Sequence, residues 1–318
     1  MVKQTKQIGF ILTLLVVAAV YIACNSLFGY SFLQGNNSRN VTIDTTVNIT
    51  NSLPEVLFVS IESGATNITL NAGTEKLITC NATVRDWNGG STITNVSATF
   101  FYNLTKTSTG VDDNNDHYTN VTCNVSSTYD IYTRNVTCTF PVQYYANNGR
   151  WRCNVTAHDP YVGFNESVVN FSTSGFNTTN IDALLALNVT TLIDYGNLSV
   201  GDTSDPQQAN VTNLGNQNIN ISVRGYGNYS YLANNVGMYC DIGNISVDSE
   251  KFNLIGGTNI ANYRNLSHSA TQVPGMTMLQ QTNDSQQVLN TTYWILFVPP
   301  NPFGRCNGTI IFQAERSS

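Results

Sequence analysis

The sequence has few of the residues that carry most enzyme chemistry. It contains only three histidines, His117, His158 and His268, and only 11% of its 318 residues are charged. A serine hydrolase would have to use one of these histidines, and no Gly-x-Ser-x-Gly motif precedes a helical pattern. No Cys-x-x-Cys pair marks a zinc site, and no spacing singles out two carboxylates for glycoside cleavage. We therefore expect no catalytic activity and no cofactor.

Positive charge is also scarce. The chain carries 14 Lys and Arg residues against 20 Asp and Glu residues, a formal net charge of −6. This acidic and evenly distributed charge excludes nucleic acid as a partner. The apolar share of 41% is too high for a disordered chain. A length of 318 residues suits about two domains, each large enough for its own core.

One long apolar stretch stands at the N-terminus, in residues 1–33. Lys3 and Lys6 precede an uncharged apolar run through Cys24, and the next charge is Arg39. The basic flank should stay inside while the rest is exported. With the aromatic residues that follow, the run would extend roughly 39 Å as a helix, enough to cross a bilayer core. We expect a signal anchor, with a cleaved signal peptide or a lipoprotein-like or prepilin-like processing site as alternatives.

Asparagine is abundant and lies in one recurring pattern. The chain has 43 Asn residues, and 24 of them begin an Asn-x-Ser/Thr triplet, against roughly nine expected at random for this acceptor signal of N-linked glycans. Together with export, this predicts a glycoprotein at the extracellular face of the cell membrane or in the secreted fraction. The acceptor sites that we expect within the folded region are Asn81, Asn95, Asn103, Asn120, Asn124, Asn135, Asn154, Asn188, Asn210, Asn220, Asn244 and Asn307.

The cysteines agree with export. Apart from Cys24, six cysteines remain, and an even number in an oxidising compartment favours disulfides. Six cysteines allow 15 pairings. From their positions along the chain, we expect the pairs Cys80 with Cys153, Cys123 with Cys138, and Cys240 with Cys306.

The cysteines also lie in segments that alternate as strands do. Around Cys80, apolar residues occupy one parity, and Asn81 stands on the other. The same parity recurs at Cys153 and Asn154, and again before Cys138. In each case the acceptor Asn should face solvent while the cysteine faces the core.

The rest of the chain shows strand and turn signals only. No segment after residue 33 has a sustained helical period, and Gly, Asn and Pro recur about every ten residues, as between sandwich strands. We expect an all-β exported region with two tandem immunoglobulin-like β-sandwich domains behind the N-terminal helix. The expected parts are a glycosylated stalk at 34–52, a sandwich with two disulfides at 53–171, a linker at 172–179 and a sandwich with one disulfide at 180–318.

The first of these domains carries a specific resemblance. The run from Asn148 to Cys153 resembles the corner of immunoglobulin-like domains, where an aromatic residue two positions before the second Cys ties a strand to its own turn. Trp151 stands where Tyr is usual. The resemblance implies a sandwich whose two sheets are joined by a long disulfide, while Cys123 and Cys138 would hold the ends of an added hairpin.

The second domain resembles a different group of proteins. Residues 193–202 and 210–219, with Asp194-Tyr195-Gly196 and Asn213-Leu214-Gly215-Asn216, are similar to secreted sandwich domains of archaeal cell-surface glycoproteins, as are the closing segments 293–299 and 304–310. The resemblance implies an archaeal surface or secreted glycoprotein. The family has no single known activity, so no catalytic or ligand-binding role follows from it.

One polar cluster has the spacing of metal ligands. Asp112, Asn114 and Asp116 match the first three ligand positions of an Asp-x-Asn-x-Asp calcium loop. His117 stands where that loop needs Gly, and Cys123 where it needs Glu, which excludes an EF-hand. The three residues are the candidate calcium ligands, with a solvated turn as the alternative.

Two functions fit these features. The first is a structural or adhesive surface protein anchored by its N-terminal helix. The second is a subunit of an extracellular filament, in which an extended segment near residues 40–60 adds a strand to a neighbour's sheet. The alternation of Val41, Ile43 and Thr45 suits such a strand and an ordinary stalk equally. The expected partners are the membrane, N-linked glycans, and copies of the chain itself or other envelope components.

Overall fold

The computed structural model describes Leu15, Val17 and residues 42–49, 51–126, 130–158, 177–227 and 235–317. The chain divides into two compact units, Met1–Ile49 and Thr50–Ser318. In the first unit, residues 42–49 have no regular secondary structure. Almost all of the expected N-terminal helix lies outside the described residues. Within the described part, no helix combines the length and the apolar character that a membrane span requires.

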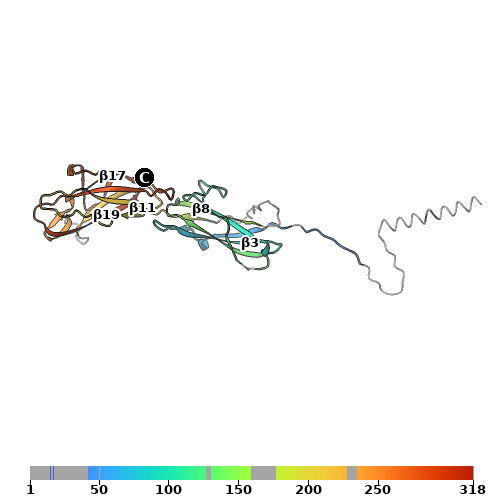
Figure 1. Ribbon diagram of the computed structural model, residues 1–318. Coiled ribbons are helices and arrows are strands. Elements are labelled where there is room, and N and C mark those ends of the chain that lie inside the picture. Colours follow the sequence, from blue (N-terminus) through green and yellow to red (C-terminus); the bar gives the residue numbers. More distant parts are fainter. Residues whose placement is uncertain are drawn as a thin grey trace, which may run out of the picture. The chain divides into compact units, whose positions relative to one another are not determined.

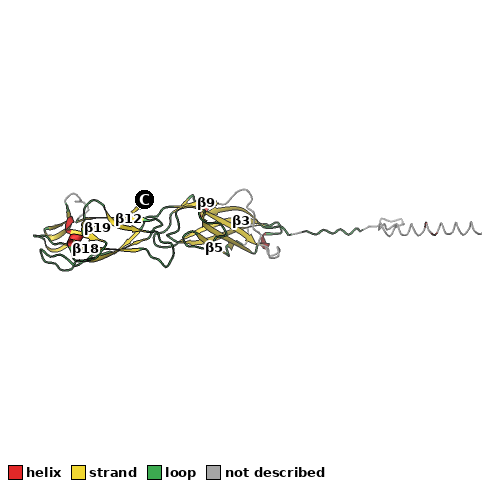
Figure 2. Ribbon diagram, turned by 90° about the horizontal axis from the view of Figure 1, so that it is seen from above, coloured by secondary structure: helices red, strands yellow, loops and turns green. Residues whose placement is uncertain are grey.

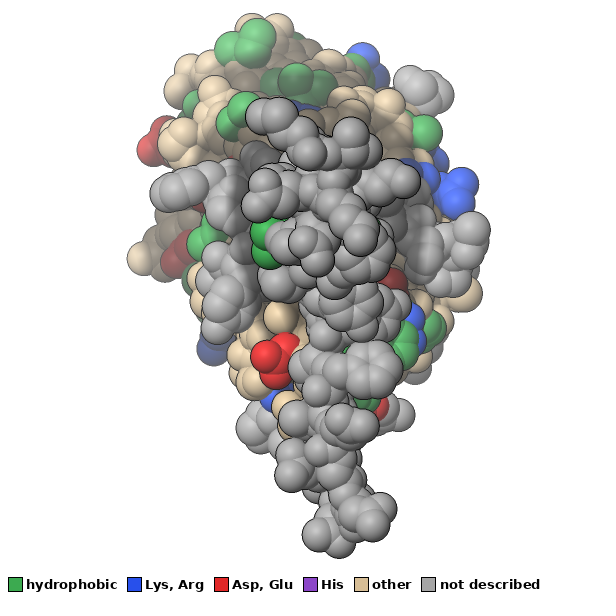
Figure 3. All heavy atoms as spheres, turned by 90° about the vertical axis from the view of Figure 1, so that its right-hand side faces the viewer, with side chains coloured by type: hydrophobic (Ala, Val, Ile, Leu, Met, Phe, Trp, Pro, Cys, Tyr) green, Lys and Arg blue, Asp and Glu red, His purple; other side chains and the backbone are tan. Residues whose placement is uncertain are grey.

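The second unit consists of strands connected by turns and a few short 3-10 helices, as Figures 1 and 2 show. This confirms the all-β fold class. In the space-filling view of Figure 3, charged side chains lie among larger areas of uncharged ones. That surface agrees with the low share of charged residues in the sequence.

Two sheets that share one core form the first sandwich. Their strand orders are β1-β3-β7-β6 and β2-β9-β8-β4-β5, and only β2 and β9 pair in parallel. The strands are β1 (Glu55–Ile61), β2 (Asn67–Ile68), β3 (Lys76–Arg85), β4 (Asn95–Tyr102), β5 (His117–Asn120), β6 (Asn124–Val125), β7 (Thr133–Val142), β8 (Gly149–His158) and β9 (Asn177–Ile181), with 3-10 turns at Glu62–Gly64 and Gly90–Thr92.

The alternation read from the sequence sets which faces of these sheets are buried. In β3, Cys80 is fully buried and Asn81 is half-buried. In β8, Cys153 is fully buried and Asn154 is half-buried. The disulfide between the two cysteines joins one sheet to the other. The core of the sandwich therefore forms around this bond, with both cysteines on the face that the strand parity predicts.

The aromatic corner is also confirmed. The Trp151 ring is fully buried, and its Nε1–H donates to the carbonyl of Asn147 at 2.7 Å. Its ring stacks on Phe100 with centroids 4.8 Å apart. Trp151 thus performs the structural role of the usual tyrosine, because an indole N–H can donate as a phenol does.

The linker expected at 172–179 is wrong for its last residues. Asn177–Ile181 forms β9, which lies between β8 and β2, and Ile181 belongs to the core of the first sandwich. The first sandwich therefore runs at least to residue 181. The Ser, Thr, Gly and Asn content of residues 172–179 suggested a loop. Thr, however, is β-branched and suits a strand that buries alternate side chains. Residues 172–176 lie outside the described part.

A second pair of sheets follows. One sheet has the strand order β10-β11-β18-β15-β16. In the other, β19 pairs with β13 over its first half and with β12 over its second half, while β14 pairs with β13 and β17 pairs with β12. All of this pairing is antiparallel. The strands are β10 (Leu187–Val189), β11 (Gln207–Asn213), β12 (Ile219–Tyr226), β13 (Val236–Ile242), β14 (Asn244–Ser246), β15 (Glu250–Asn253), β16 (Arg264–Asn265), β17 (Thr271–Met278), β18 (Leu289–Leu296) and β19 (Phe303–Arg316), with 3-10 turns at Val247–Ser249 and Ile260–Asn262.

Polar side chains connect the two sandwiches. The buried amide of Asn216 donates to the carbonyl of Ala146 at 3.1 Å. Gln280 donates to the carbonyl of Tyr145 at 2.6 Å and to the side chain of Asn147 at 2.9 Å. Hydrogen bonds require specific distances and angles between donor and acceptor. The bonds at this junction therefore hold the two sandwiches in one orientation.

Candidate functional site

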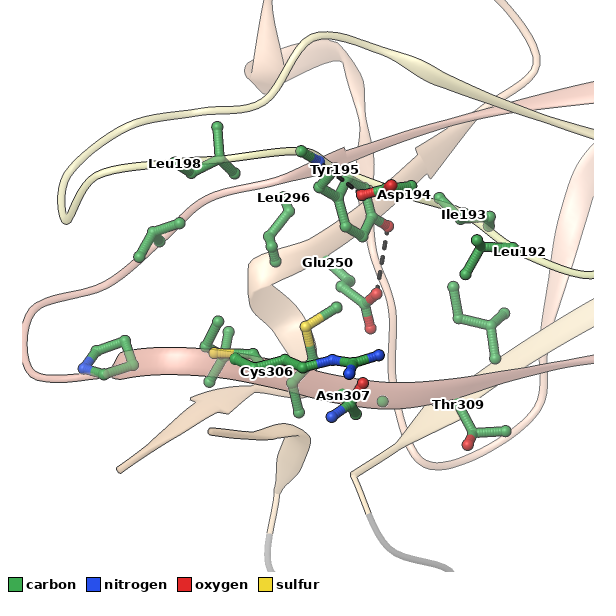
Figure 4. A pocket seen from close by; sticks show the side chains of 18 of the residues that line it. Leu192, Ile193, Asp194, Tyr195, Leu198, Glu250, Leu296, Cys306, Asn307 and Thr309 are labelled. Atoms are coloured by element: carbon green, nitrogen blue, oxygen red, sulfur yellow. Dashed lines mark hydrogen bonds between the residues drawn. The ribbon is translucent and has the colours of Figure 1, made fainter. Parts of the chain in front are cut away.

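An open groove lies on the second sandwich. It has a volume of about 1220 Å³ and lies between the segment 189–200, which follows β10, and the first part of β19. Figure 4 shows side chains from both of these elements directed into it. The volume exceeds the roughly 300–1,000 Å³ of typical small-molecule sites. A longer, extended occupant would suit it better.

One wall of the groove is β19, which is paired along one side only. β12 ends opposite Thr309, and β13 pairs from the adjacent Gly308 onward. The N–H of Gly227, just after β12, donates to the carbonyl of Val236 in β13 at 2.8 Å. The two strands therefore follow each other along the same side of β19. In the described part of the chain, no strand pairs with its other side.

The exposure of β19 agrees with this edge position. None of its residues is buried, although Ile310 and Phe312 pack against the core as partly buried side chains. A central strand of a sandwich would bury such residues on its inner face. The free N–H and C=O groups of this edge are available to another strand.

The floor of the groove is apolar. It includes Met238, Ile245, Leu296 and Val298, which form a small core cluster with 2% to 9% of their surface exposed. Leu198, from the opposite wall, packs against this cluster as a partly buried side chain. The groove thus leads from solvent directly onto core side chains.

A buried carboxyl group lies within this apolar lining. Glu250 opens β15 and shares the parity of the buried Phe252, so its side chain points into the sandwich. Its Oε1 accepts a hydrogen bond of 3.2 Å from the hydroxyl of Tyr195, as Figure 4 shows, while Oε2 is buried without a partner. Burial raises the pKa of Glu250 to about 7, and the Tyr195 bond partly opposes the increase.

Tyr195 completes this polar pair. Burial and the nearby Glu250 carboxyl raise its pKa well above the ordinary value. The hydroxyl therefore stays protonated and serves only as a hydrogen-bond donor to Glu250. The other oxygen of Glu250, Oε2, is left buried without a hydrogen-bond partner in the described part of the chain.

The three disulfides have the pairings expected from the sequence. Cys80–Cys153 joins the two sheets of the first sandwich. Cys123 directly precedes β6, and Cys138 lies in β7. Their disulfide therefore joins the two strands of the β6–β7 hairpin, as expected. Cys240–Cys306 joins directly opposite residues of β13 and β19 and lies beside the groove.

The expected glycan acceptors all lie outside the buried core. Some of these side chains hydrogen-bond to neighbouring strands, as where Asn81 Oδ1 accepts from the Thr137 hydroxyl at 2.9 Å. None of the twelve is buried. The exposed ones are Asn124, Asn135, Asn188, Asn210, Asn244 and Asn307, and the half-buried ones are Asn81, Asn95, Asn103, Asn120, Asn154 and Asn220. Whether they carry glycans stays a prediction.

The candidate calcium ligands bind different partners. Asp112 Oδ1 lies 2.8 Å from His117 Nδ1, the Asn114 amide donates to Asp284 at 2.6 Å, and Asp116 accepts from a threonine hydroxyl at 3.2 Å. Among the described residues, no three His, Cys, Asp or Glu side chains come together in a way that could hold a metal ion. The calcium site stays a prediction, and the loop has hydrogen bonds of its own.

A further apolar feature lies in the first unit. Residues 42–49 have no strand partner in the described part of the chain, and Ile43, Val47 and Ile49 are 82%, 79% and 83% exposed. These three residues share one parity of an extended chain, and Thr45 stands between them on the same parity. An exposed apolar row of this kind needs a partner surface.

Sequence reasoning did not identify the groove. The alternation of Ile310, Phe312 and Ala314 shows an inward-facing row in β19, but it does not show which strands pair with β19. Glu250 follows Asp248 and Ser249 and reads as part of a polar turn.

No family model matches the chain, and no curated protein matches it. Among solved structures it is similar to the CsuC–CsuE chaperone and tip adhesion subunit complex of the Csu pili of Acinetobacter baumannii, at 12% identity and a TM-score of 0.35, covering 81% of this chain and 100% of that one. It is also similar to tandem immunoglobulin domains of titin, at 9% identity and a TM-score of 0.22, covering 83% and 97% of the two chains. The C-terminal domain of the AgI/II polypeptide BspA of Streptococcus agalactiae gives 10% identity and a TM-score of 0.22, covering 83% and 96%.

These TM-scores are below 0.5, so the likenesses support no conclusion about function. The fold is established by the paired sheets, their cores and the disulfides that join them.

Proposed function

We propose that the protein is a non-enzymatic, N-glycosylated cell-surface protein with a structural or adhesive role, of archaeal type and anchored by its N-terminal segment. It projects two tandem sandwich domains from the cell. The observation that carries the proposal is the division of β3, β7 and β8 into a buried cysteine face and an opposite face that carries an acceptor Asn, as at Cys80 and Asn81. A glycan on the outward face would leave the core intact.

The disulfides support an extracellular location. Disulfides of this kind form and persist in oxidising compartments and are rare in the cytosol. The first sandwich alone contains two of the three bonds. Such cross-links stabilise domains that work outside the cell.

The histidines support a non-enzymatic role. His117 is fully buried beside Asp112. His158 lies 3.1 Å from Ser97 on the neighbouring strand, and His268 bonds to the backbone carbonyl of Gly225 at 2.9 Å. Each contact is accounted for by strand or loop structure, and we propose no cofactor.

Mass and location test this proposal directly. The intact mass of the native protein should fall after enzymatic or chemical deglycosylation, and N-terminal sequencing should show whether residues 1–33 are retained. The protein should fractionate with membranes or medium, with its six paired cysteines unreactive to thiol reagents. A cytosolic protein with unmodified asparagines and six free thiols would contradict the proposal.

A second candidate is a subunit of an extracellular filament. It is favoured by the exposed alternating row in residues 42–49 and by the unpaired side of β19. Electron microscopy of native cell envelopes separates the two candidates. Repeating fibres that contain this protein would support the filament subunit, and isolated protomers would support the anchored surface protein.

A further inference from the structure

We propose that the groove of the second sandwich receives residues 42–49 of a second copy as an added β-strand along the free side of β19, with the Thr45 hydroxyl hydrogen-bonded to Glu250. This inference rests on the filament candidate above and names its contact. It follows from three features of the described residues, namely the length of the groove, its lining and its unpartnered carboxyl oxygen.

The lengths agree. Residues 42–49 would span about 26 Å as a strand, at about 3.3 Å per residue. The part of β19 that lines the groove, from Phe303 to Phe312, would span about 33 Å by the same rise. The segment therefore fits within the exposed edge, where its backbone would complete hydrogen bonds that β19 leaves open.

The side-chain pattern of residues 42–49 determines which face of the added strand would turn toward the groove. With Ile43, Val47 and Ile49 turned inward, three apolar side chains would cover the apolar floor of the groove. The opposite parity would place the carboxylate of Asp44 in the same apolar space, near Glu250. Burying a second acidic group there is strongly unfavourable, so only the first parity is acceptable.

The polar residue of the inward row can meet the buried polar atom of the groove that lacks a partner. Glu250 Oε2 is buried and has no hydrogen-bond partner in the described part of the chain. Thr45 lies between Ile43 and Val47, and its hydroxyl can donate to the carboxylate or accept from the protonated carboxyl. An entirely apolar strand would leave Oε2 without a partner.

A contact of this kind leads to an open assembly. The groove and the inserting segment are different surfaces of the chain, so each copy would offer one and fill the other. Such head-to-tail contacts extend into filaments unless the geometry closes a ring. The same contact would also remove the exposed β19 edge and the exposed apolar row from solvent.

The first test compares two variants of the full-length protein in its native envelope. Ile43→Asp places a charge on the inward row, and Thr46→Asp places the same charge on the outward row as a matched control. We expect Ile43→Asp to abolish assemblies seen by electron microscopy and Thr46→Asp to retain them. Both positions lie in an extended segment outside the folded sheets, so equal melting temperatures should show that both variants fold.

The outcomes separate this inference from the filament candidate. If the unaltered protein assembles and Ile43→Asp assembles equally well, strand insertion is refuted while the filament function stands. If the unaltered protein never assembles, the filament function is refuted, and the peptide test below decides whether the groove accepts the strand. Insertion of the segment into its own chain, seen as a monomer that excludes added peptide, would also refute the contact between copies.

The second test uses a labelled synthetic peptide of residues 42–49 and full-length Ile43→Asp protein, whose groove is then unoccupied. Fluorescence anisotropy should show binding, and a Thr45→Val peptide should bind about tenfold more weakly, the scale of one buried hydrogen bond. With Glu250→Met protein, the two peptides should bind equally. No binding of either peptide would refute the proposed strand addition, and equal binding by Glu250-containing protein would refute the Thr45–Glu250 contact.

Discussion

The buried carboxyl group of Glu250 makes the stability of the second sandwich depend on pH. Its pKa is about 7 in the folded protein, against an ordinary value of 4.5. Between these two values the folded state keeps a proton that the unfolded chain releases. The free energy of unfolding therefore falls as pH rises through this window, because the native state binds more protons there.

The size of the effect follows from the two pKa values. One pKa unit corresponds to 1.36 kcal/mol, so a difference of about 2.5 units lowers the free energy of unfolding by about 3 kcal/mol between pH 4.5 and 7. Below this window the contribution of Glu250 is fully favourable, and above it the loss is complete. This loss is large against a typical net stability of about 5–15 kcal/mol.

A Glu250→Gln variant isolates this contribution, since Gln stays neutral and its carbonyl can still accept the Tyr195 hydrogen bond. Urea unfolding of both proteins at pH 4 to 8, with disulfides intact, should give similar stabilities near pH 4 and a more stable variant near pH 8. The fluorescence of Trp294 reports on this region, because its ring packs on Phe252, which lies in β15 with Glu250. The two ring centroids are 5.5 Å apart. Parallel pH profiles for the two proteins would refute the reasoning.

Three further predictions concern the first sandwich. Replacing Cys80 and Cys153 together with Ser should lower the free energy of unfolding by about 4 kcal/mol, from the loop entropy of a 73-residue separation, and an unchanged urea midpoint would contradict this. Trp151→Phe removes the bond to Asn147 and part of the buried indole packing, so calorimetry should show a loss of at least about 1 kcal/mol, whereas an unchanged melting temperature would show that the corner contributes nothing. Asn135→Gln should remove the mass of one glycan with no change in melting temperature, because this side chain is exposed, and an unchanged mass would show that the site is not used.

The sequence was sufficient where a feature depends on local alternation. The parity around Cys80 predicts both the core-facing position of its sulfur and the outward position of Asn81, because each strand residue can face only one of two sides. The position of Trp151 relative to Cys153 likewise predicts its bond to the preceding turn. Features of this kind are set within a few residues of one strand.

The sequence was insufficient where a feature depends on which strands meet. Ile181 lies at the end of a polar run, yet its strand completes the sheet of β8, because the adjacent edge of that sheet was available. The groove is the opposite case, since it arises from a side of β19 that no described strand pairs with. Glu250 is buried by elements distant in sequence, including Tyr195, so its local polar context gives no sign of its environment.

The disulfide between Cys240 and Cys306 also has a mechanical consequence. It spans 66 positions of the sequence and connects two adjacent strands. A pulling force that reaches the chain beyond these cysteines cannot lengthen the enclosed segment while the bond is intact. Reduction would release roughly 230 Å of additional extension, at about 3.5 Å per residue, so the redox state of this bond sets how far the second sandwich can stretch under load.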